Sequence, residues 1–323
     1  MLLSCLLPQV NVHLIVNPNA GRRKGLATAE HARSVLESAG LTVVTHISTV
    51  PGETVSLAAE ITGSGRFDPA TISGVVALGG DGTLFEMING LLRGAAGPGT
   101  PTAGPGTPPR LPFPIGQIPV GTGNSFIRDL EISRTEDALQ AVLGGRTRPV
   151  DLGTLRCDAG FWYFINLLGA GFVSAVAHRA GRYKRLGALS YIIGVLQETI
   201  ALAPQDLTIT VDGVEHKRHG IFVEICNSRY TGGNMLIAPD ARIDDGLLDV
   251  IFMTGTSRRK LLSLFPRIFS GTHVQDPVIE VFRGSRVTVR TKKPWLLTPD
   301  GETFGSTPIE VGILPHHLEI FCR

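Results

Sequence analysis

The first half of the chain alternates apolar runs with stretches of helical periodicity. Runs rich in Val, Ile and Leu predict strands at residues 12–16, 41–48, 73–80 and 114–121. Apolar positions at helical spacing predict helices at residues 28–40, 53–62, 83–94 and 135–145. Because strands that alternate with helices form parallel sheets covered on both faces, residues 9–150 are expected to be an α/β domain.

From about Val150 the pattern changes to short runs separated by turn residues, several of them alternating. Two helices are expected there, Lys184–Leu202 and Arg258–Phe269. The predicted strands are residues 151–157, 160–169, 206–213, 219–227, 246–255, 277–284, 285–291, 307–314 and 318–323. This texture favours a mainly antiparallel, β-sandwich-like second domain over residues 151–323, with the boundary near Arg148–Asp151.

A Pro/Gly-rich insertion interrupts the first domain at residues 95–114. It holds seven of the 21 prolines, and the sequence GPGTP occurs twice. Such a segment lacks the apolar residues for a core, so a mobile surface insertion is expected, with a partner-binding polyproline stretch as the alternative.

Composition argues against several classes of protein: nucleic-acid-binding, zinc-binding and membrane-spanning proteins. Hydrophobic residues make up 43% and charged residues 18% of the 323 residues, and the net charge is +2, so nucleic acid is not an expected partner. The four cysteines are scattered without metal-binding spacing, which indicates a reduced, cytoplasmic protein. No run reaches the ~18 apolar residues of a membrane span, and Gly187–Ala203, which comes nearest, contains polar residues.

Three turns bearing Gly or Asn each follow an apolar strand: Asn17–Gly21, Gly79–Thr83 and Gly121–Asn124. In a parallel sheet these turns emerge at the carboxyl edge, where ligands bind. Glycine lets backbone N–H groups approach a phosphate, and a following helix N-terminus favours negative charge. The chain has neither the GxxxxGK[ST] phosphate loop nor a GxGxxG fingerprint.

Asp81 stands among these glycines, in GGDGT. A carboxylate among anion-binding amides would repel a bare phosphate, so Asp81 indicates a site for Mg²⁺, bound directly or through water. The alternative is that Asp81 caps the following helix.

The series NPNAG, GGDGTLFEMING and IPVGTGNSFIRDL resembles the diacylglycerol kinase catalytic-domain family, which includes bacterial soluble lipid kinases and sphingosine kinases. The segments FINLLGAGF, KRLGALSY, NSRYTGGNMLIAPDARIDDGLLDV and DGE continue the resemblance over nearly the whole chain. GGDGT alone is shared with NAD kinases, which have a related fold. The resemblance implies an ATP-dependent, Mg²⁺-requiring kinase that phosphorylates a lipid hydroxyl.

The resemblance also implies roles for individual residues. The implied nucleotide contacts are Asn17, Gly21, Thr49, Gly79, Gly80, Asp81, Gly82, Thr83, Glu86 and Thr122. A magnesium site is implied at the side chain of Asp245 and the carbonyls of Arg242 and Leu247; the alternative for DDG is a structural β-turn.

Two acids in TPDGE, Asp300 and Glu302, match the catalytic carboxylates of bacterial diacylglycerol kinases, whereas sphingosine kinases give that task to the counterpart of Asp81. Asp81 is therefore expected at the metal–phosphate centre, and Asp300 or Glu302 near the lipid hydroxyl. The chain departs from the family at Ser125, where many bacterial members have an acid of the Mg²⁺ network.

A lipid acceptor requires contact with a bilayer, and two stretches join basic residues to apolar helices. The basic residues are Arg179, Arg182, Lys184, Arg185, Arg258, Arg259, Lys260 and Arg267. They suit reversible binding to a peripheral membrane surface, or they are the solvated ends of ordinary helices. The protein is a candidate for assembly as a homodimer. An NAD kinase-like enzyme and a non-catalytic lipid-binding protein are the alternatives, and the sequence leaves the acceptor lipid open.

Overall fold

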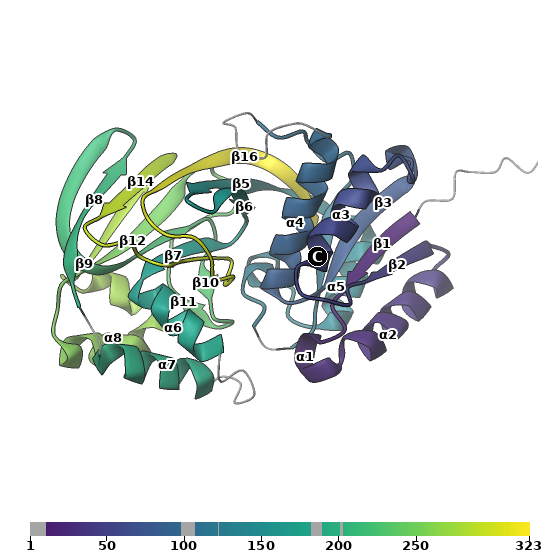
Figure 1. The fold of residues 1–323 in the computed structure, drawn as a ribbon. Coiled ribbons are helices and arrows are strands. Elements are labelled where there is room, and N and C mark those ends of the chain that lie inside the picture. Colours follow the sequence, from purple (N-terminus) through teal and green to yellow (C-terminus); the bar gives the residue numbers. More distant parts are fainter. Residues whose placement is uncertain (1–10, 98–106, 122, 182–188, 201–202) are drawn as a thin grey trace, which may run out of the picture. The chain divides into compact units, whose positions relative to one another are not determined.

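The computed structural model describes residues 11–97, 107–121, 123–181, 189–200 and 203–323 (Figure 1). These residues form two compact units. The first unit comprises residues 11–97 and 107–150 together with His317–Arg323, and the second comprises Asp151–His316.

The first unit contains a parallel sheet in the order β4-β3-β1-β2. Its strands are β1 (Asn11–Val16), β2 (Thr42–Ile47), β3 (Ile72–Gly79) and β4 (Ile115–Pro119). The helices are α1 (Ala20–Arg23), α2 (Gly25–Ser38), α3 (Glu53–Gly63), α4 (Asp81–Ala96) and α5 (Thr135–Gly144). The predicted α/β domain with a parallel sheet is confirmed.

Helix α4 packs closely on α3 because glycines face that helix. A Cβ on Gly90 would lie 2.3 Å from the carbonyl oxygen of Val55, and one on Gly94 would lie 2.3 Å from that of Ala59. Contacts this close exclude any side chain, so these two positions fix α4, and with it the turn at its N-terminus.

The C-terminal segment His317–Arg323 packs with the first unit, whereas the prediction placed it in the second domain. Residues predicted as two strands form one, β16 (Ile309–Phe321), and Ile320 pairs in parallel with Ile115 of β4. The ring of Phe321 fills the space left by two glycines: a Cβ would lie 2.6 Å from it on Gly74 and 3.1 Å on Gly116. This complementarity explains why the chain end returns to the sheet.

Part of the Pro/Gly insertion is packed. Helix α4 extends to Ala96, Phe113 is buried, and the carbonyl of Pro114 accepts the N–H of Val75 at 3.1 Å. The segment therefore contributes to the core at its C-terminal end, where an aromatic side chain and a strand carbonyl are available, and its N-terminal end continues helix α4. Residues 98–106, on which the expected mobility centres, lie outside the described residues.

The second unit is mainly antiparallel, as predicted, with the sheet order β13-β12-β9-β8-β14-β16 and β7 and β15 joined beside β9. Its longer strands are β5 (Thr147–Cys157), β6 (Gly160–Phe164), β7 (Leu167–Gly171), β8 (Gln205–Val211), β9 (Val214–Cys226), β12 (Leu248–Thr254), β13 (Ile279–Gly284) and β14 (Arg286–Thr291). Shorter strands are β10 (Tyr230–Thr231), β11 (Met235–Leu236) and β15 (Leu297–Pro299).

The described residues of this unit include the α-helices α6 (Phe172–Gly181), α7 (Leu189–Ile200) and α8 (Arg258–Ile268) (Figure 1). Helix α6 was not predicted. The predicted helix Lys184–Leu202 is represented by α7, and residues 182–188 and 201–202 lie outside the described residues. Among the helices described, none is both long and apolar enough to cross a membrane.

A histidine pair with one buried member, His13, predicts how the stability of the first unit responds to acid. Nδ1 of His13 lies 3.0 Å from Nε2 of His46, and His13 is fully buried. Burial, reinforced by His46, lowers the pKa of His13 from 6.5 to about 4. Between these values the unfolded chain binds a proton that the native protein does not, so stability falls as pH falls.

We expect the free energy of unfolding to decrease between pH 7 and pH 5 by about 2 kcal/mol less in His13→Phe than in the unaltered protein. Urea titrations at both pH values measure this difference. Replacement of the exposed His31 by Gln serves as the control for the loss of a histidine at another site. Equal pH dependence in all three proteins would show that His13 is not the group responsible.

Candidate active site

The Gly- and Asn-bearing turns of the first unit meet at the carboxyl edge of its sheet. The side-chain amide of Asn17, after β1, donates to Oγ1 of Thr83 at 3.4 Å, and its backbone N–H donates to the carbonyl of Leu78 at 3.1 Å. A Cβ on Gly79 would lie 2.3 Å from Oγ1 of Thr83. Asn17, Gly79 and Thr83, predicted separately from sequence, therefore lie together.

Gly21 joins the turn after β1 to the turn after β4. Its φ is +56°, and a Cβ there would lie 2.6 Å from the side chain of Val120 and 3.1 Å from the amide nitrogen of Gly121. Arg22 and Arg23 continue with φ of 62° and 69°, a conformation that is unfavourable for residues other than glycine. Both arginines are exposed, so this strained turn places two cations at the surface beside the sheet edge.

Asp81 is the first residue of α4, and its carboxylate contacts the segment after β4. The N–H of Ser125 donates to both oxygens, at 3.2 and 2.9 Å. Burial raises the pKa of Asp81 from 3.8 to about 6, although hydrogen bonds from Ser125, Phe126 and Gln117 oppose the rise. These contacts differ from those of a helix cap, because they lie on another segment.

The N-terminus of α4 has no capping side chain, although Asp81 lies in its first turn. Gly80 is its N-cap and has no side chain to accept the first amides. The initial N–H groups of a helix lack intrahelical acceptors, so these amides and the helix dipole favour an anion at this edge. A Cβ on Gly80 would find no atom closer than Oδ1 of Asn124, at 3.8 Å, which leaves the backbone approachable.

The remaining predicted nucleotide contacts are less tightly grouped. Glu86 is half-buried in α4, and Gly82 lies in its first turn. Thr49 is exposed after β2, where its N–H and hydroxyl donate to the carboxylate of Glu53 at the start of α3. Thr122 lies outside the described residues.

Asp300 and Glu302 stand in different environments on the turn after β15. The buried carboxylate of Asp300 accepts three backbone N–H groups between β6 and β7, from Ile165 at 2.9 Å, Asn166 at 2.9 Å and Leu167 at 3.1 Å. This contact splits the predicted strand 160–169 in two. Glu302 is exposed, so it is the carboxylate of the pair that is accessible to a substrate.

Asp245 already has a cationic partner. Its Oδ2 forms an ion pair with the guanidinium of Arg283, and its Oδ1 accepts the N–H of Leu247 at 3.1 Å. Within the described part of the chain, no group of three or more His, Cys, Asp or Glu side chains has the geometry to hold a metal ion. The magnesium site at Asp245 and the carbonyls of Arg242 and Leu247 stays a prediction, and it requires that Arg283 move away.

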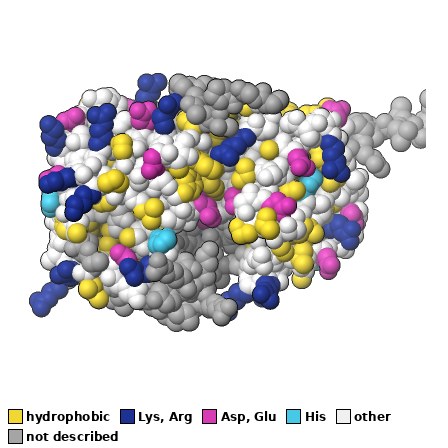
Figure 2. Space-filling model, in the orientation of Figure 1, with side chains coloured by type: hydrophobic (Ala, Val, Ile, Leu, Met, Phe, Trp, Pro, Cys, Tyr) yellow, Lys and Arg dark blue, Asp and Glu magenta, His cyan; other side chains and the backbone are white. Residues whose placement is uncertain are grey.

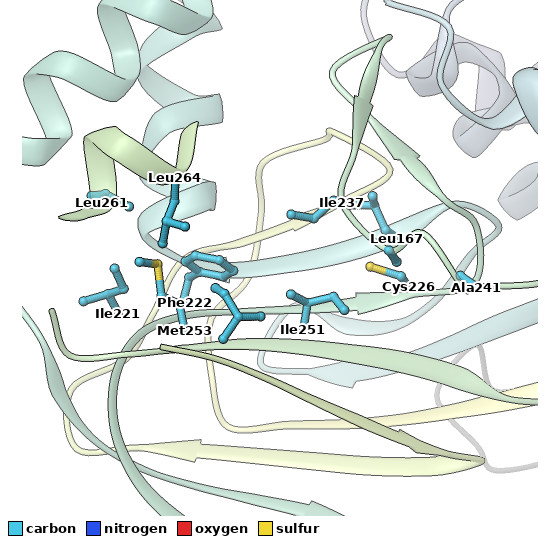
Figure 3. Close-up of a cluster of buried hydrophobic side chains, with 12 residues drawn as sticks. Leu167, Ile221, Phe222, Cys226, Ile237, Ala241, Ile251, Met253, Leu261 and Leu264 are labelled. Atoms are coloured by element: carbon cyan, nitrogen blue, oxygen red, sulfur yellow. The ribbon is translucent and has the colours of Figure 1, made fainter. Parts of the chain in front are cut away.

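An apolar cavity of about 100 Å³ lies in the second unit between the helices and the sheet. Helix α8 places Leu261 and Leu264 over Phe222 of β9 and Met253 of β12 (Figure 3). Thr298 and Gly301, which flank Asp300, also line the cavity. The cavity therefore reaches the turn that carries Glu302.

Comparison with known proteins identifies the family. Residues 11–155 match the family model of the diacylglycerol kinase catalytic domain, and residues 166–322 match that of the YegS C-terminal NAD kinase beta sandwich-like domain. The diacylglycerol kinase of Bacillus subtilis (strain 168) is 30% identical over 315 residues, which cover 95% of this chain and 94% of the relative. The chain belongs to the diacylglycerol kinase catalytic-domain family.

Other members of the diacylglycerol kinase family give the same result. The diacylglycerol kinase of Mycobacterium tuberculosis (strain ATCC 25618 / H37Rv) is 30% identical and covers 96% of this chain and 94% of its own length. A crystal structure of a diacylglycerol kinase from Bacillus anthracis str. Sterne superposes with a TM-score of 0.69 at 18% identity and covers 97% of both chains, which shows the shared fold. At the family level the protein is a lipid kinase.

Sequence reasoning missed several groups of this diacylglycerol-kinase-family site. Ser125 was noted as a departure, but its role as the amide partner of Asp81 depends on a contact between residues 44 positions apart. Arg283 and Glu224, a buried acid on the cavity wall, carry no motif. For Glu224 the signal was an acid within the apolar run 219–227, which is unusual for a buried strand.

Proposed function

We propose that this chain transfers the γ-phosphoryl group of ATP to the hydroxyl of a lipid acceptor, with Mg²⁺ as the metal ion. The observation that carries this proposal is Asp81, a carboxylate among closely approaching glycine turns at the N-terminus of α4. An anion site beside an acid fits a nucleotide phosphate that arrives with its own cation.

The residues around Asp81 fit a bound cation. Desolvation is the main cause of its raised pKa, and no side chain among the described residues contributes a positive charge that opposes the rise. Within this part of the chain, the carboxylate therefore lacks the charge partner that burial normally requires. Asp81 would hold Mg²⁺ directly or through water, and Ser125 would orient the carboxylate. The metal supplies neutralisation of phosphate charge, and Arg22 and Arg23 add to it from the neighbouring turn.

Glu302 is proposed as the general base and Asp300 as the residue that positions it. The acceptor's hydroxyl oxygen forms a bond to the γ-phosphorus while the bond from that phosphorus to the β,γ-bridging oxygen breaks; ADP leaves, and the hydroxyl proton passes to Glu302. Such a base need act only late in phosphoryl transfer, because positioning and charge stabilisation dominate. An accessible carboxylate meets this requirement better than one committed to three amides.

The apolar cavity is the proposed site for the hydrocarbon part of the acceptor. Its wall consists mainly of Leu, Ile, Val, Phe and Met side chains, and an apolar pocket with few polar groups is typical of a small-molecule site. Because Thr298 and Gly301 belong to its wall, a chain bound there would have its polar end near Glu302.

The test is a lipid panel with labelled ATP and Mg²⁺, using diacylglycerol, monoacylglycerol, ceramide, a sphingoid base and phosphatidylglycerol in mixed micelles. We expect label in at least one product lipid and no transfer when ATP is replaced by a non-hydrolysable analogue. If all five lipids stay unlabelled while ATP and NAD yield labelled NADP, the NAD kinase-like alternative would take the place of this proposal.

Reversible contact with a membrane surface is proposed at the exposed side of α8. Arg259, Leu262 and Phe269 are exposed there, which joins a cation to apolar side chains. The other predicted basic residues mostly have structural partners. Arg258 caps α7 at the carbonyls of Thr199 and Ile200, Lys260 and Arg267 both pair with Asp276, Arg179 pairs with Glu198, and Arg182, Lys184 and Arg185 lie outside the described residues.

On the face drawn in Figure 2, Lys and Arg side chains are dispersed and mixed with Asp and Glu, so a local patch has to supply the attraction. We expect Arg259→Glu to lower binding to vesicles containing phosphatidylglycerol by roughly tenfold, because each basic residue near an anionic surface contributes about 1 kcal/mol. Sedimentation with vesicles measures this. Arg290→Glu makes the same charge change at an exposed position of β14 and is the control; an equal loss in both variants would contradict a specific surface at α8.

A further inference from the structure

Glu224 is a buried acid on the wall of the apolar cavity. It lies in β9, is 4% exposed, and pairs with Gly169 of β7 and Ile251 of β12. Residues directly opposite each other in an antiparallel pair point to the same face, and Gly169 has no side chain to cover its neighbour. The carboxyl group therefore faces the cavity, and the side chains of Thr298 and Val173 occupy the space over Gly169.

One oxygen of the Glu224 carboxyl group is left unpaired by the part of the protein that the structure describes. This oxygen, Oε2, is buried and has no hydrogen-bond partner within the described residues. Burial alone raises the pKa of Glu224 from 4.5 to about 8, so the group is mostly neutral at pH 7 and has a proton to donate. An unpaired buried polar group costs roughly 1–3 kcal/mol, which a ligand that pairs with it would recover.

A second unpaired polar atom lies on the same cavity wall. His273 is 1% exposed, and its Nε2 lies 3.0 Å from the carbonyl of Ile237, so Nε2 carries the proton. Burial lowers the pKa of His273, which keeps the ring neutral. Its Nδ1 is then a buried acceptor, without a partner among the residues that the structure describes.

We propose that Glu224, with His273, selects acceptor lipids that carry an uncharged hydrogen-bonding group beside their hydrocarbon, such as a hydroxyl, ester or amide. The inference rests on the proposed lipid kinase function. Glu224 donates to a carbonyl or hydroxyl oxygen of the lipid, and His273 accepts from a hydroxyl or amide proton. A hydrocarbon without such a group leaves both atoms unpaired, which is the strongest basis for discrimination in a buried site.

The geometry predicts opposite effects of one substitution on stability and on substrate binding. Glu224→Leu removes an unpaired polar group from an apolar wall, so the melting temperature of the free protein should rise. The same change should raise KM for a short-chain diacylglycerol in mixed micelles about tenfold or more, with kcat changed less than threefold. Glu224→Gln is neutral and keeps a donor and an acceptor, so its KM should stay within about threefold.

Glu215→Leu is the matched control, because it makes the same change at an exposed position of β9 that does not line the cavity, and it should leave KM unchanged. Binding of a fluorescent diacylglycerol analogue, measured without ATP, gives a readout that does not require catalysis. We expect Glu224→Leu to weaken this binding about tenfold and Glu224→Gln to preserve it.

Two outcomes would overturn the inference. In one, Glu224→Leu leaves both KM and analogue binding unchanged. In the other, Glu224→Gln loses a cationic sphingoid base selectively, which would mean that Glu224 acts as a charged carboxylate. Failure of the proposed function is distinguishable, since the unaltered protein would then transfer phosphate to no lipid while analogue binding still depended on Glu224.

Discussion

Replacing Asp81 by Asn is expected to lower kcat/KM for phosphoryl transfer by about 10²-fold or more, the scale of losing a principal electrostatic contributor. The substitution keeps the size of the side chain and an oxygen that can accept the N–H of Ser125, but it removes the negative charge. Without that charge, the cation that neutralises the nucleotide phosphates loses its anchor at the sheet edge. Initial rates with labelled ATP at several Mg²⁺ concentrations measure the effect.

The expected stability effect of Asp81→Asn has the opposite sign. Because the pKa of Asp81 is raised in the native state, the ionised carboxylate destabilises the free protein at pH 7 relative to a neutral group. Asp81→Asn should therefore unfold at a urea concentration equal to or higher than that for the unaltered protein, although it has lost most of its activity. Asp68→Asn, at an exposed turn position of the same unit, is the control and should change neither quantity. Unchanged activity in Asp81→Asn would remove Asp81 from the mechanism.

Glu224 shows the same relation as Asp81: its replacement is expected to stabilise the free protein and to weaken its function. Both acids lie where sequence patterns favour apolar or small residues, and burial raises the pKa of each. Within the described residues, Asp81 lacks a cationic partner and Oε2 of Glu224 lacks a hydrogen-bond partner, and such groups are retained where a ligand supplies the partner. In the proposed function, Asp81 of the first unit would thus bind a cation that accompanies the nucleotide phosphates. Glu224 of the second unit would bind a polar group on the lipid's hydrocarbon chain.

The parts of the fold that follow from local pattern were predictable. The strands β1 to β4 are apolar runs, and the turns at Asn17, Gly79 and Gly121 follow them directly, so their meeting at one sheet edge followed from parallel topology. Helix α6 was missed because its residues continue an apolar, glycine-rich run that has no clear helical start.

Features set by distant residues were not predictable. The break between β6 and β7 depends on the carboxylate of Asp300, more than 130 residues away. The return of Phe321 to the first unit depends on the space at Gly74 and Gly116, and the ion pair of Asp245 with Arg283 depends on strand register. A sequence motif identifies residues of this kind, but it does not show which distant residues they contact in the fold.

Substitutions of the two acids in the turn after β15, Asp300 and Glu302, should have different effects on kcat and on stability. Glu302→Gln is expected to lower kcat about 10²-fold with little change in stability, because an exposed carboxylate contributes a proton acceptor and no structural contact. Rates at saturating lipid and urea titrations, run on the same preparations, measure both quantities. If Glu302→Gln had a normal kcat, Glu302 would not be the general base, and Asp81 would be the next acid to test in that role.

Asp300→Asn should act on stability first. Asn tolerates the positive φ of 47° at this position, so the backbone preference is retained. One oxygen can still accept the amides of Asn166 and Leu167, but the new NH₂ group opposes the N–H of Ile165. Leaving that buried donor unpaired is expected to cost about 1–3 kcal/mol in the free energy of unfolding.

Because the turn also carries Glu302 and borders the apolar cavity, the same loss in Asp300→Asn should reduce kcat through displacement of the base. The two defects should then be coupled: conditions that restore the fold of Asp300→Asn, such as an osmolyte that favours the compact state, should recover part of its activity but none of the activity of Glu302→Gln. Recovery in both variants, or in neither, would contradict the division of roles between a positioning acid and a reacting one.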